Sequence, residues 1–468
     1  MTDSKRNTQL KQTPKPVTFK NYVGYALGDL GGCMTFAILG SFLTPYYLEV
    51  AGMGAADVAM MYILIKIWDA INDPLMGVLL DKAFARSRNK HGKFRPWMMR
   101  SAPLLLLSSI LMFTAPTFTD GALRTLVAYV TYLLYEASYT MFNIPYGSLL
   151  AAMANTDEER SKFSSARGFG ATVGNLLPLF FFPLILDYFA NNQAMGYTLG
   201  VTICAVIGFI ACILSIMWTR ERNLESLPKD KEAEEAEVND IKFTDILHVF
   251  RKNRAFVAMC IVGIAFCIQQ YVVTTLQIYM FRDVLGALTL MSIAIVLSMG
   301  INFILMAIIP SFSTKFGLER TVRITQLISM ILFIVTFLLP TSPYVFLIAS
   351  SLASGIGGTT VLMQWGMMGE VIDYNEVVVG KRTEGSIYGT FNLTRRIGQA
   401  IGSSAAVALL PVIGFIPNAV SQTATALTGI KGLITFIPAI CMFICWFSIK
   451  FIWNITAEDK KRIAELKN

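Results

Sequence analysis

Histidine is scarce in this chain of 468 residues, which contains only His91 and His248. Both lie in polar segments outside the long apolar runs, so a histidine-based metal site is not expected. No pairing of a nucleophile with a base and no cluster of metal ligands is apparent either. We therefore expect neither an enzyme nor a bound cofactor, and no metal beyond a transported cation.

Cysteine is also sparse and lacks the spacing of a metal or redox motif. The seven cysteines include no Cys-x-x-Cys pair, and all of them fall inside long apolar segments. We interpret them as reduced packing residues. They are Cys33, Cys204, Cys212, Cys260, Cys267, Cys441 and Cys445.

Charged residues make up only 15% of the chain, whereas 54% of it is hydrophobic. Apolar runs long enough to cross a bilayer recur along the whole length. The first twenty residues are polar and basic, so no cleavable signal peptide is expected. The pattern predicts an all-α membrane protein with twelve transmembrane helices, near residues 22–48, 57–81, 97–115, 122–150, 164–188, 196–218, 255–280, 288–312, 321–339, 343–368, 384–410 and 431–453.

The basic residues predict the orientation of these spans. Lys and Arg are concentrated in the N-terminal tail (1–21), in the loops after the second and eighth spans, and in the C-terminal tail (454–468). The loops on the other side are nearly bare, with Arg282 as the one clear exception. By the positive-inside rule both termini face the cytoplasm. Because the basic residues are scattered over short loops, the net charge of +8 does not indicate a nucleic-acid partner.

A long polar segment, residues 219–254, divides the chain into two parts of six spans each. We interpret this segment as a cytoplasmic linker between bundles at 22–218 and 255–453. The loops of the two parts show weak sequence similarity to each other. This similarity predicts two pseudo-symmetric six-helix bundles. Such duplicated halves are typical of transporters that work by alternating access around a site near the middle of the membrane.

Glycines spaced four residues apart occur in two of the spans. The first span has Gly24, Gly28 and Gly32, and the eleventh has Gly398 and Gly402. Stripes of small residues let helices approach closely. Two interpretations remain open, namely tight static packing and a surface that slides or bends during a conformational change.

Polar side chains interrupt the second span where it should lie deepest in lipid. Asp69, Asn72 and Asp73 share one helical face. A charge at mid-bilayer costs roughly 2.5–3.5 kcal/mol on insertion scales. Thr140 of the fourth span lies at a similar depth, and oxygen ligands of this kind suit a hard cation. We predict a cation site there, with one alternative: Lys66 could neutralise an aspartate in a purely structural pair.

The eleventh span carries two adjacent arginines, Arg395 and Arg396, roughly 17 Å along the helix. Consecutive helical residues point about 100° apart, so only one of them is expected to face a central cavity. A guanidinium binds anions and hydroxyl groups and stays charged. The alternatives are a substrate clamp, with Asn392 one turn before Arg396, and a salt bridge to an acidic residue such as Glu136 of the fourth span.

Other polar and aromatic side chains are weaker candidates. Arg167 either reaches the cytoplasmic interface or lines the cavity, and Asp29 either accepts a hydrogen bond within the bundle or belongs to a gate. Tyr139 and Trp365 could stack on the apolar face of a sugar. Near the cytoplasmic end of the tenth span and in the loop that follows, salt bridges of a cytoplasmic gate are predicted among Glu370, Asp373 and Arg382.

Several motifs together resemble one known family, the glycoside–pentoside–hexuronide:cation symporters of the major facilitator superfamily. They span nearly the whole chain, and their combination is more specific than any single piece. They are Gly28-Asp29, Trp68-Asp-Ala-Ile-Asn-Asp-Pro-Leu-Met-Gly77, Gly92-Lys-Phe-Arg-Pro-Trp97, Asn143-Ile-Pro-Tyr-Gly-Ser148, Glu384-Gly-Ser-Ile-Tyr388 and Thr394-Arg-Arg-Ile-Gly-Gln-Ala-Ile-Gly402.

The resemblance implies cation-coupled sugar uptake, with the cation at the four residues of the second and fourth spans named above. In members that carry galactosides, acidic residues of the first and fourth helices hold the sugar. The matching positions here are Cys33 and Asn143. The basic residue of the family's eleventh helix corresponds to Arg396, Arg395 is an additional arginine, and Arg167 matches an arginine of the fifth helix.

Loss of two sugar-binding carboxylates with retention of arginines shifts the cavity toward positive charge. We therefore hypothesise an acidic substrate, either a hexuronide or a sulfonated sugar or its glycoside. A neutral glycoside or pentoside, a lysolipid, export in place of import, and a membrane sensor or scaffold remain as alternatives. We expect a monomer in the lipid bilayer of the bacterial inner membrane, coupled to Na⁺, H⁺ or Li⁺.

Overall fold

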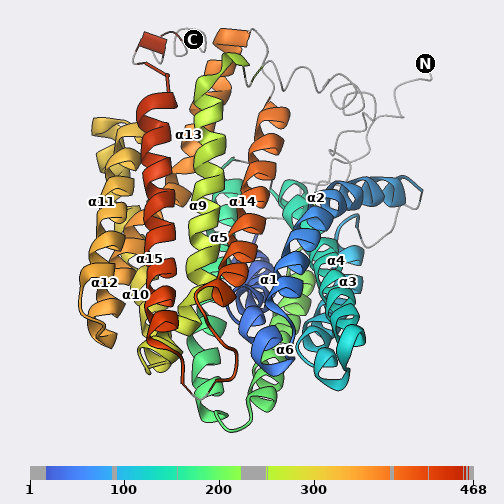
Figure 1. The fold of residues 1–468 in the computed structure, drawn as a ribbon. Coiled ribbons are helices and arrows are strands. Elements are labelled where there is room, and N and C mark those ends of the chain that lie inside the picture. The colour runs from blue at the N-terminus through green and yellow to red at the C-terminus, as the bar shows by residue number, and fades with distance from the viewer. Residues whose placement is uncertain are drawn as a thin grey trace, which may run out of the picture.

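The structure is a computed structural model that describes residues 17–86, 92–154, 157–222, 249, 251–379, 384–419, 421–456, 458, 459 and 462. Within these ranges all regular elements are helices (Figure 1). The first half contains α1 (Phe19–Pro45), η1 (Tyr46–Val50), α2 (Ala55–Arg86), α3 (Arg95–Met112), η2 (Ala115–Phe118), α4 (Gly121–Met153), α5 (Asp157–Tyr188) and α6 (Gln193–Trp218). The second contains α9 (Arg254–Tyr279), η3 (Met280–Val284), α10 (Thr289–Phe316), α11 (Leu318–Leu338), α12 (Pro343–Gly357), α13 (Thr359–Val379), α14 (Glu384–Val412), α15 (Ala424–Phe447) and η4 (Ser448–Ile452).

The described helices form twelve segments of membrane-spanning length, as the sequence predicts. Seven of these segments are long and apolar enough to cross a bilayer, and one of the seven, Pro343–Val378, runs through both α12 and α13. The other five are α2, α3, α4, α10 and α14. Most of the expected linker, 219–254, lies outside the described residues.

The two halves pack in the same way internally. In the first half α1 packs against α5 and α6, and in the second α9 packs against α14 and α15. Both α1 and α9 end in a short π-helix, Tyr46–Val50 and Met280–Val284. The bundles meet where α2 packs on α14, α5 on α10 and α1 on α9. This internal repetition, visible as two groups of helices in Figure 1, confirms the predicted pseudo-symmetric bundles.

The hydrophobic core is shared between the bundles at only one end of the molecule. The end where α1 begins and η4 finishes is called here the termini end, and the opposite one the far end. At the far end a single core contains residues of both bundles, among them Tyr46, Tyr62, Tyr279 and Phe415. Toward the termini end there are two separate cores, one from each bundle. Burial of apolar surface therefore joins the bundles at the far end.

Tight helix contacts occur at the predicted glycines of α14. A Cβ on Gly398 would lie 2.5 Å from the carbonyl oxygen of Ile264 on α9, and one on Gly402 would lie 2.8 Å from that of Ile268. No side chain fits at these distances, because the neighbour is backbone. The close-packing interpretation is therefore confirmed for this pair.

In α1 the glycine stripe is tight over only part of its length. A Cβ on Gly24 would lie 2.6 Å from Cβ of Trp218, and one on Gly28 would overlap the Tyr146 ring, whereas Gly32 leaves an ordinary 3.6 Å to Tyr139. Gly24 and Gly28 therefore leave no room for a side chain, whereas Gly32 leaves room for a small one.

Gly170 of α5 is the position where a side chain should cost most. A Cβ there would overlap the backbone carbonyl of Ala26 on α1. We expect Gly170→Ala to lower the stability of the purified protein by about 1–3 kcal/mol, as overpacking does, measured by thermal unfolding. Gly168→Ala, two residues away with no atom within 4 Å of the added Cβ, should be neutral or slightly stabilising. Equal effects of the two changes would contradict the packing argument.

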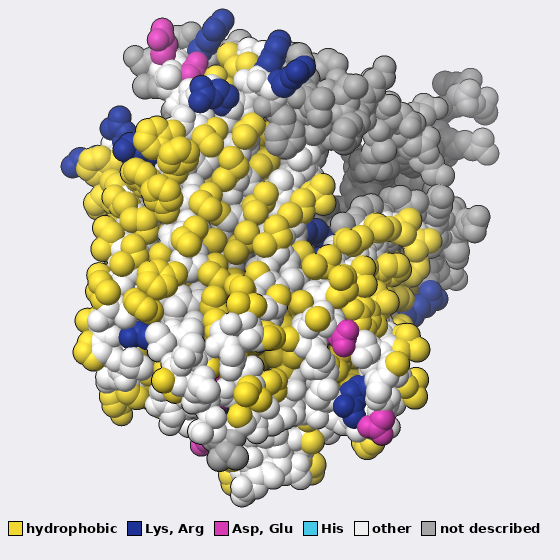
Figure 2. Space-filling model, viewed as in Figure 1, with side chains coloured by type: hydrophobic (Ala, Val, Ile, Leu, Met, Phe, Trp, Pro, Cys, Tyr) yellow, Lys and Arg dark blue, Asp and Glu magenta, His cyan; other side chains and the backbone are white. Residues whose placement is uncertain are grey.

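The surface has the banding of a protein that crosses a membrane. In Figure 2 hydrophobic side chains cover the middle of the visible face, and Lys and Arg gather toward the termini end. Large apolar side chains such as Ile67, Leu107 and Ile304 are more than half exposed on the helices. Exposed apolar surface of this extent needs a lipid environment.

Candidate transport site

A buried charged cluster joins α2 and α4. Nζ of Lys66 lies 2.7 Å from Oδ2 of Asp69 and 3.6 Å from Oε1 of Glu136. The three side chains are between 4% and 10% exposed, so they have been almost fully removed from solvent. Buried charges of this kind are costly unless they are paired. This group is called the Lys66 cluster below.

The Lys66 cluster has one negative charge more than its positive charges when all three groups are ionised. Oδ1 of Asp69 is buried and has no hydrogen-bond partner among the described residues. Lys66 therefore forms the ion pair with Asp69 that a purely structural role requires. Oδ1 of Asp69 remains without a hydrogen bond from the described residues. The remaining negative charge can be balanced by a cation, by a proton or by Arg396, which lies within electrostatic range of Asp69.

The other predicted cation ligands continue from the cluster toward the termini end. Asn72 follows Asp69 by three residues on α2, and its buried Nδ2 has no hydrogen-bond partner within the described structure. Thr140, one turn after Glu136 on α4, is 4% exposed. Asp73 belongs to α2, but its side chain lies outside the described residues.

The two arginines of α14 point to different neighbours. Cγ of Arg395 would lie 3.3 Å from a Cβ on Gly263, which places this side chain against α9. Arg396 is instead within electrostatic range of Asp69 on α2. Arg396 is thus the one of the pair that lies near α2 of the other bundle, and the expectation that only one of them faces a central cavity stays a prediction.

A second ion pair links α1 with α5. Nε of Arg167 donates to Oδ2 of Asp29 at 2.9 Å, and its guanidinium lies 5.2 Å from the centre of the Tyr146 ring. Tyr146 in turn donates to the carbonyl of Tyr25 at 2.6 Å. Arg167 is therefore paired with Asp29 inside the first bundle while its side chain is 37% exposed, and its role stays a prediction.

The remaining sugar candidates lie around these two centres. Cys33 lies against α5, because a Cβ added to Gly174 of that helix would be 3.0 Å from Cβ of Cys33. Tyr139 stacks on Phe36, with ring centres 5.4 Å apart. Asn143 on α4 and Asn392 on α14 are half-buried.

Two groups of predicted residues are only partly covered by the structure. The side chain of Trp365 and the whole of Arg382 lie outside the described residues. Glu370 and Asp373 are half-buried on α13 near the termini end. The gate that these residues were predicted to form therefore stays a prediction.

Sequence reasoning missed the ion pair that joins the bundles at the far end. Arg282 of η3 donates to Glu49 of η1 through both terminal nitrogens, at 2.5 and 2.6 Å. Asn418 adds a hydrogen bond to the carbonyl of Glu49 at 2.7 Å. The signal was present, since Arg282 is a basic residue in an otherwise weakly charged loop region and Glu49 occupies a similar place in the first half.

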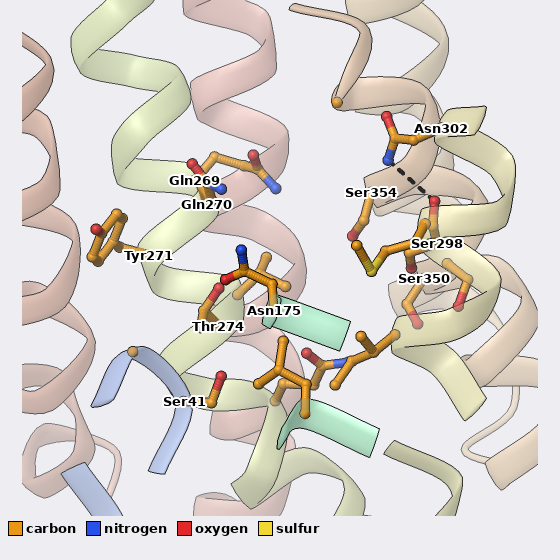
Figure 3. A pocket seen from close by; sticks show the side chains of 18 of the residues that line it. Ser41, Asn175, Gln269, Gln270, Tyr271, Thr274, Ser298, Asn302, Ser350 and Ser354 are labelled. Atoms are coloured by element: carbon orange, nitrogen blue, oxygen red, sulfur yellow. Dashed lines mark hydrogen bonds between the residues drawn. The ribbon is translucent and has the colours of Figure 1, made fainter. Parts of the chain in front are cut away.

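A cavity of about 600 Å³ was also missed. It lies among α1, α5, α9, α10 and α12, and its polar lining is shown in Figure 3. The available signal was a group of polar residues inside this span, among them Gln269, Gln270 and Thr274. This cavity is called the α9–α10 cavity below.

Paired six-helix bundles that enclose buried charges and a cavity define a multi-pass membrane transporter. The chain belongs to the MFS/sugar transport protein family, whose profile matches residues 24–457. This confirms the family indicated by the sequence motifs. The structure is also similar to that of the nucleoside transporter NupG, with a TM-score of 0.63, 13% identity and coverage of 94% of this chain and 100% of the other, which shows the shared fold.

Three curated relatives match nearly full length. An uncharacterized symporter, YjmB of Bacillus subtilis (strain 168), is 30% identical over 97% of this chain and 96% of its own. The glucuronide carrier protein homolog of Escherichia coli (strain K12) is 28% identical, with 95% and 94% covered. A putative sulfoquinovose importer of Salmonella typhimurium (strain LT2) is 26% identical, with 94% and 91% covered. These relatives are named as transporters.

Proposed function

We propose that this protein is a cation-coupled symporter that carries an acidic sugar or glycoside across the bacterial inner membrane, with both termini in the cytoplasm. The observation that carries the proposal is the Lys66 cluster, a buried group with surplus negative charge that faces Arg396 of the other bundle. Charged side chains in the middle of a membrane protein carry a free-energy cost. Coupling of transport to an ion gradient gives a reason for their presence.

The coupling mechanism follows from charge balance. The proposed cation ligands are Asp69, Asn72, Asp73 and Thr140, and the cation is Na⁺, H⁺ or Li⁺. Binding of a cation or proton neutralises the surplus carboxylate, so the bundles can close over the site without burying an unpaired charge. The loaded protein then exchanges between the conformations open to each side, as alternating access requires.

Two arguments support an acidic substrate. The positions that match the family's sugar-binding carboxylates are Cys33 and Asn143, so the arginines of α5 and α14 face fewer acidic groups. In addition, two of the relatives are named for glucuronide and sulfoquinovose, which are both anionic sugars. An arginine binds a carboxylate or sulfonate through two parallel hydrogen bonds.

Replacement of Arg396 tests this assignment. We expect Arg396→Gln to weaken binding of glucuronate or sulfoquinovose about ten- to hundredfold, which is the loss of one charged hydrogen-bonding partner. Arg100→Gln makes the same change of charge at an exposed position on α3 and should leave binding unaltered. Binding would be measured by calorimetry in lipid nanodiscs, with and without Na⁺ and at several pH values.

Two other results would reject an acidic substrate. Transport of neutral glycosides alone, unaffected by Arg396→Gln, would reject the acidic substrate and favour the neutral glycoside or pentoside alternative. Stimulation by lysolipids and not by sugars would favour the lipid alternative.

A further inference from the structure

The α9–α10 cavity is uncharged. None of the described residues that line it is Asp, Glu, Lys, Arg or His. Its volume of about 600 Å³ lies within the usual range of small-molecule sites. A charged group would lose its hydration there without a partner of opposite charge. The cavity is therefore unsuited to the carboxylate or sulfonate of the proposed substrate.

The cavity instead offers neutral hydrogen-bonding groups next to aromatic faces. Carboxamides and hydroxyls both donate and accept, as do the hydroxyl groups of a sugar or polyol, and aromatic rings pack on the apolar face of a sugar ring. Figure 3 shows side chains from α5, α9 and α10 around the space, and Tyr271 of α9 also lines it. The main polar contributors are Asn175, Gln269, Gln270, Thr274, Ser298 and Ser354.

Two helices that carry charged residues, α1 with Asp29 and α5 with Arg167, also line this neutral cavity. On α5, Ala171 and Asn175 line the cavity one and two turns after Arg167. On α9, Tyr271 lines the cavity and lies within electrostatic range of Lys66. A ligand with its anionic group at Arg167 can therefore place an attached neutral group against the lining residues of α5.

We propose that the α9–α10 cavity is a separate subsite for the uncharged, hydroxylated part of a glycoside, such as a second sugar ring or a glycerol group. The inference rests on the proposed function and narrows it, because it assigns the substrate class as an acidic sugar linked to a neutral polyol. The free acidic sugar would then fill only the charged part of the site.

The test compares linked and free sugars on the full-length protein in nanodiscs. One pair is glucuronate and glucuronate linked to xylose; the other is sulfoquinovose and its glycerol glycoside. We expect at least one linked sugar to bind about tenfold more tightly than its free partner. The double variant Gln270→Met with Thr274→Val should remove that gain, since each lost neutral hydrogen bond accounts for about two- to tenfold in affinity.

A matched control separates the subsite from general damage. Gln193→Met with Thr202→Val makes the same substitutions on α6, outside the cavity, and should change neither affinity. The inference is overturned if the cavity variant weakens free and linked sugars equally, if it leaves the linked sugar unchanged, or if alkyl chains compete for the cavity better than polyols. Failure of the unaltered protein to bind any acidic sugar would instead overturn the proposed function.

Discussion

Asp69→Asn is expected to reduce ion-driven sugar accumulation to the level of passive equilibration. The substitution removes the carboxylate that lies 2.7 Å from Lys66 and reduces the charge of the Lys66 cluster from one surplus negative charge to zero. No cation or proton is then needed for the bundles to close, so sugar movement loses its dependence on the gradient. We would measure uptake into membrane vesicles with and without imposed Na⁺ and pH gradients.

Sugar exchange in the absence of a gradient distinguishes lost coupling from lost protein. Asp69→Asn should retain exchange, whereas a merely structural pair would lose accumulation and exchange together. Asp57→Asn, an exposed position in the first turn of the same helix, should accumulate sugar normally. Undiminished ion stimulation in the Asp69 variant would contradict the cation assignment.

A triple substitution separates stability from coupling more sharply. Replacement of a buried ion pair by neutral groups is often tolerated, whereas removal of one partner is costly. Lys66→Met combined with Asp69→Asn and Glu136→Gln removes all three charges of the cluster, so it should recover part of any thermal stability lost in the single variants. If the role of the pair were structural, transport would recover with stability; we expect coupling to remain absent.

Arg282→Gln is expected to shift the protein toward a conformation that is open at the far end. The substitution leaves Glu49, 12% exposed, without the partner that reaches it from the other bundle. Loss of one partner from this half-buried pair should cost about 1–3 kcal/mol, which corresponds to roughly a five- to hundredfold change in the equilibrium between closed and open far ends. The readout is the labelling rate of a single cysteine introduced among the far-end contacts.

The far end also supplies the control for this experiment. Arg124 and Asp120 form an exposed pair within α4 and its N-cap, at 2.7 Å, with the Asp120 side chain 97% exposed. Such a surface pair contributes about 0–1 kcal/mol and does not join the bundles. Arg124→Gln should leave the labelling rate unaltered. Slow labelling in the Arg282 variant would show that the shared core alone holds the far end closed.

Most of the fold was predictable because the bilayer imposes it. Lipid offers no hydrogen bonds to the backbone, so each apolar run must form a helix. The twelve runs and the polar segment between them therefore predict the helices and the two bundles. The resemblance of the loop motifs in the two halves added the pseudo-symmetry that the packing of α1 and α9 confirms.

The candidate site was predictable only where it depends on a single helix. Helical spacing alone places Lys66 three residues before Asp69, and the structure forms that pair. The approach of Glu136 depends on how α2 packs against α4. The divergence of Arg395 and Arg396 was expected from helical geometry, but which arginine faces the Lys66 cluster depends on how α14 is rotated between α9 and α2.

The sequence by itself determined the number of spans, the presence of charges deep within them and the family to which the chain belongs, because composition and helical period are local properties. Tertiary structure alone decided that Glu49 meets Arg282 across 233 residues, and that an uncharged cavity lies between α9 and α10. Those features depend on the relative placement of two bundles, which is set by the packing of many side chains together and is not written in any one stretch of chain.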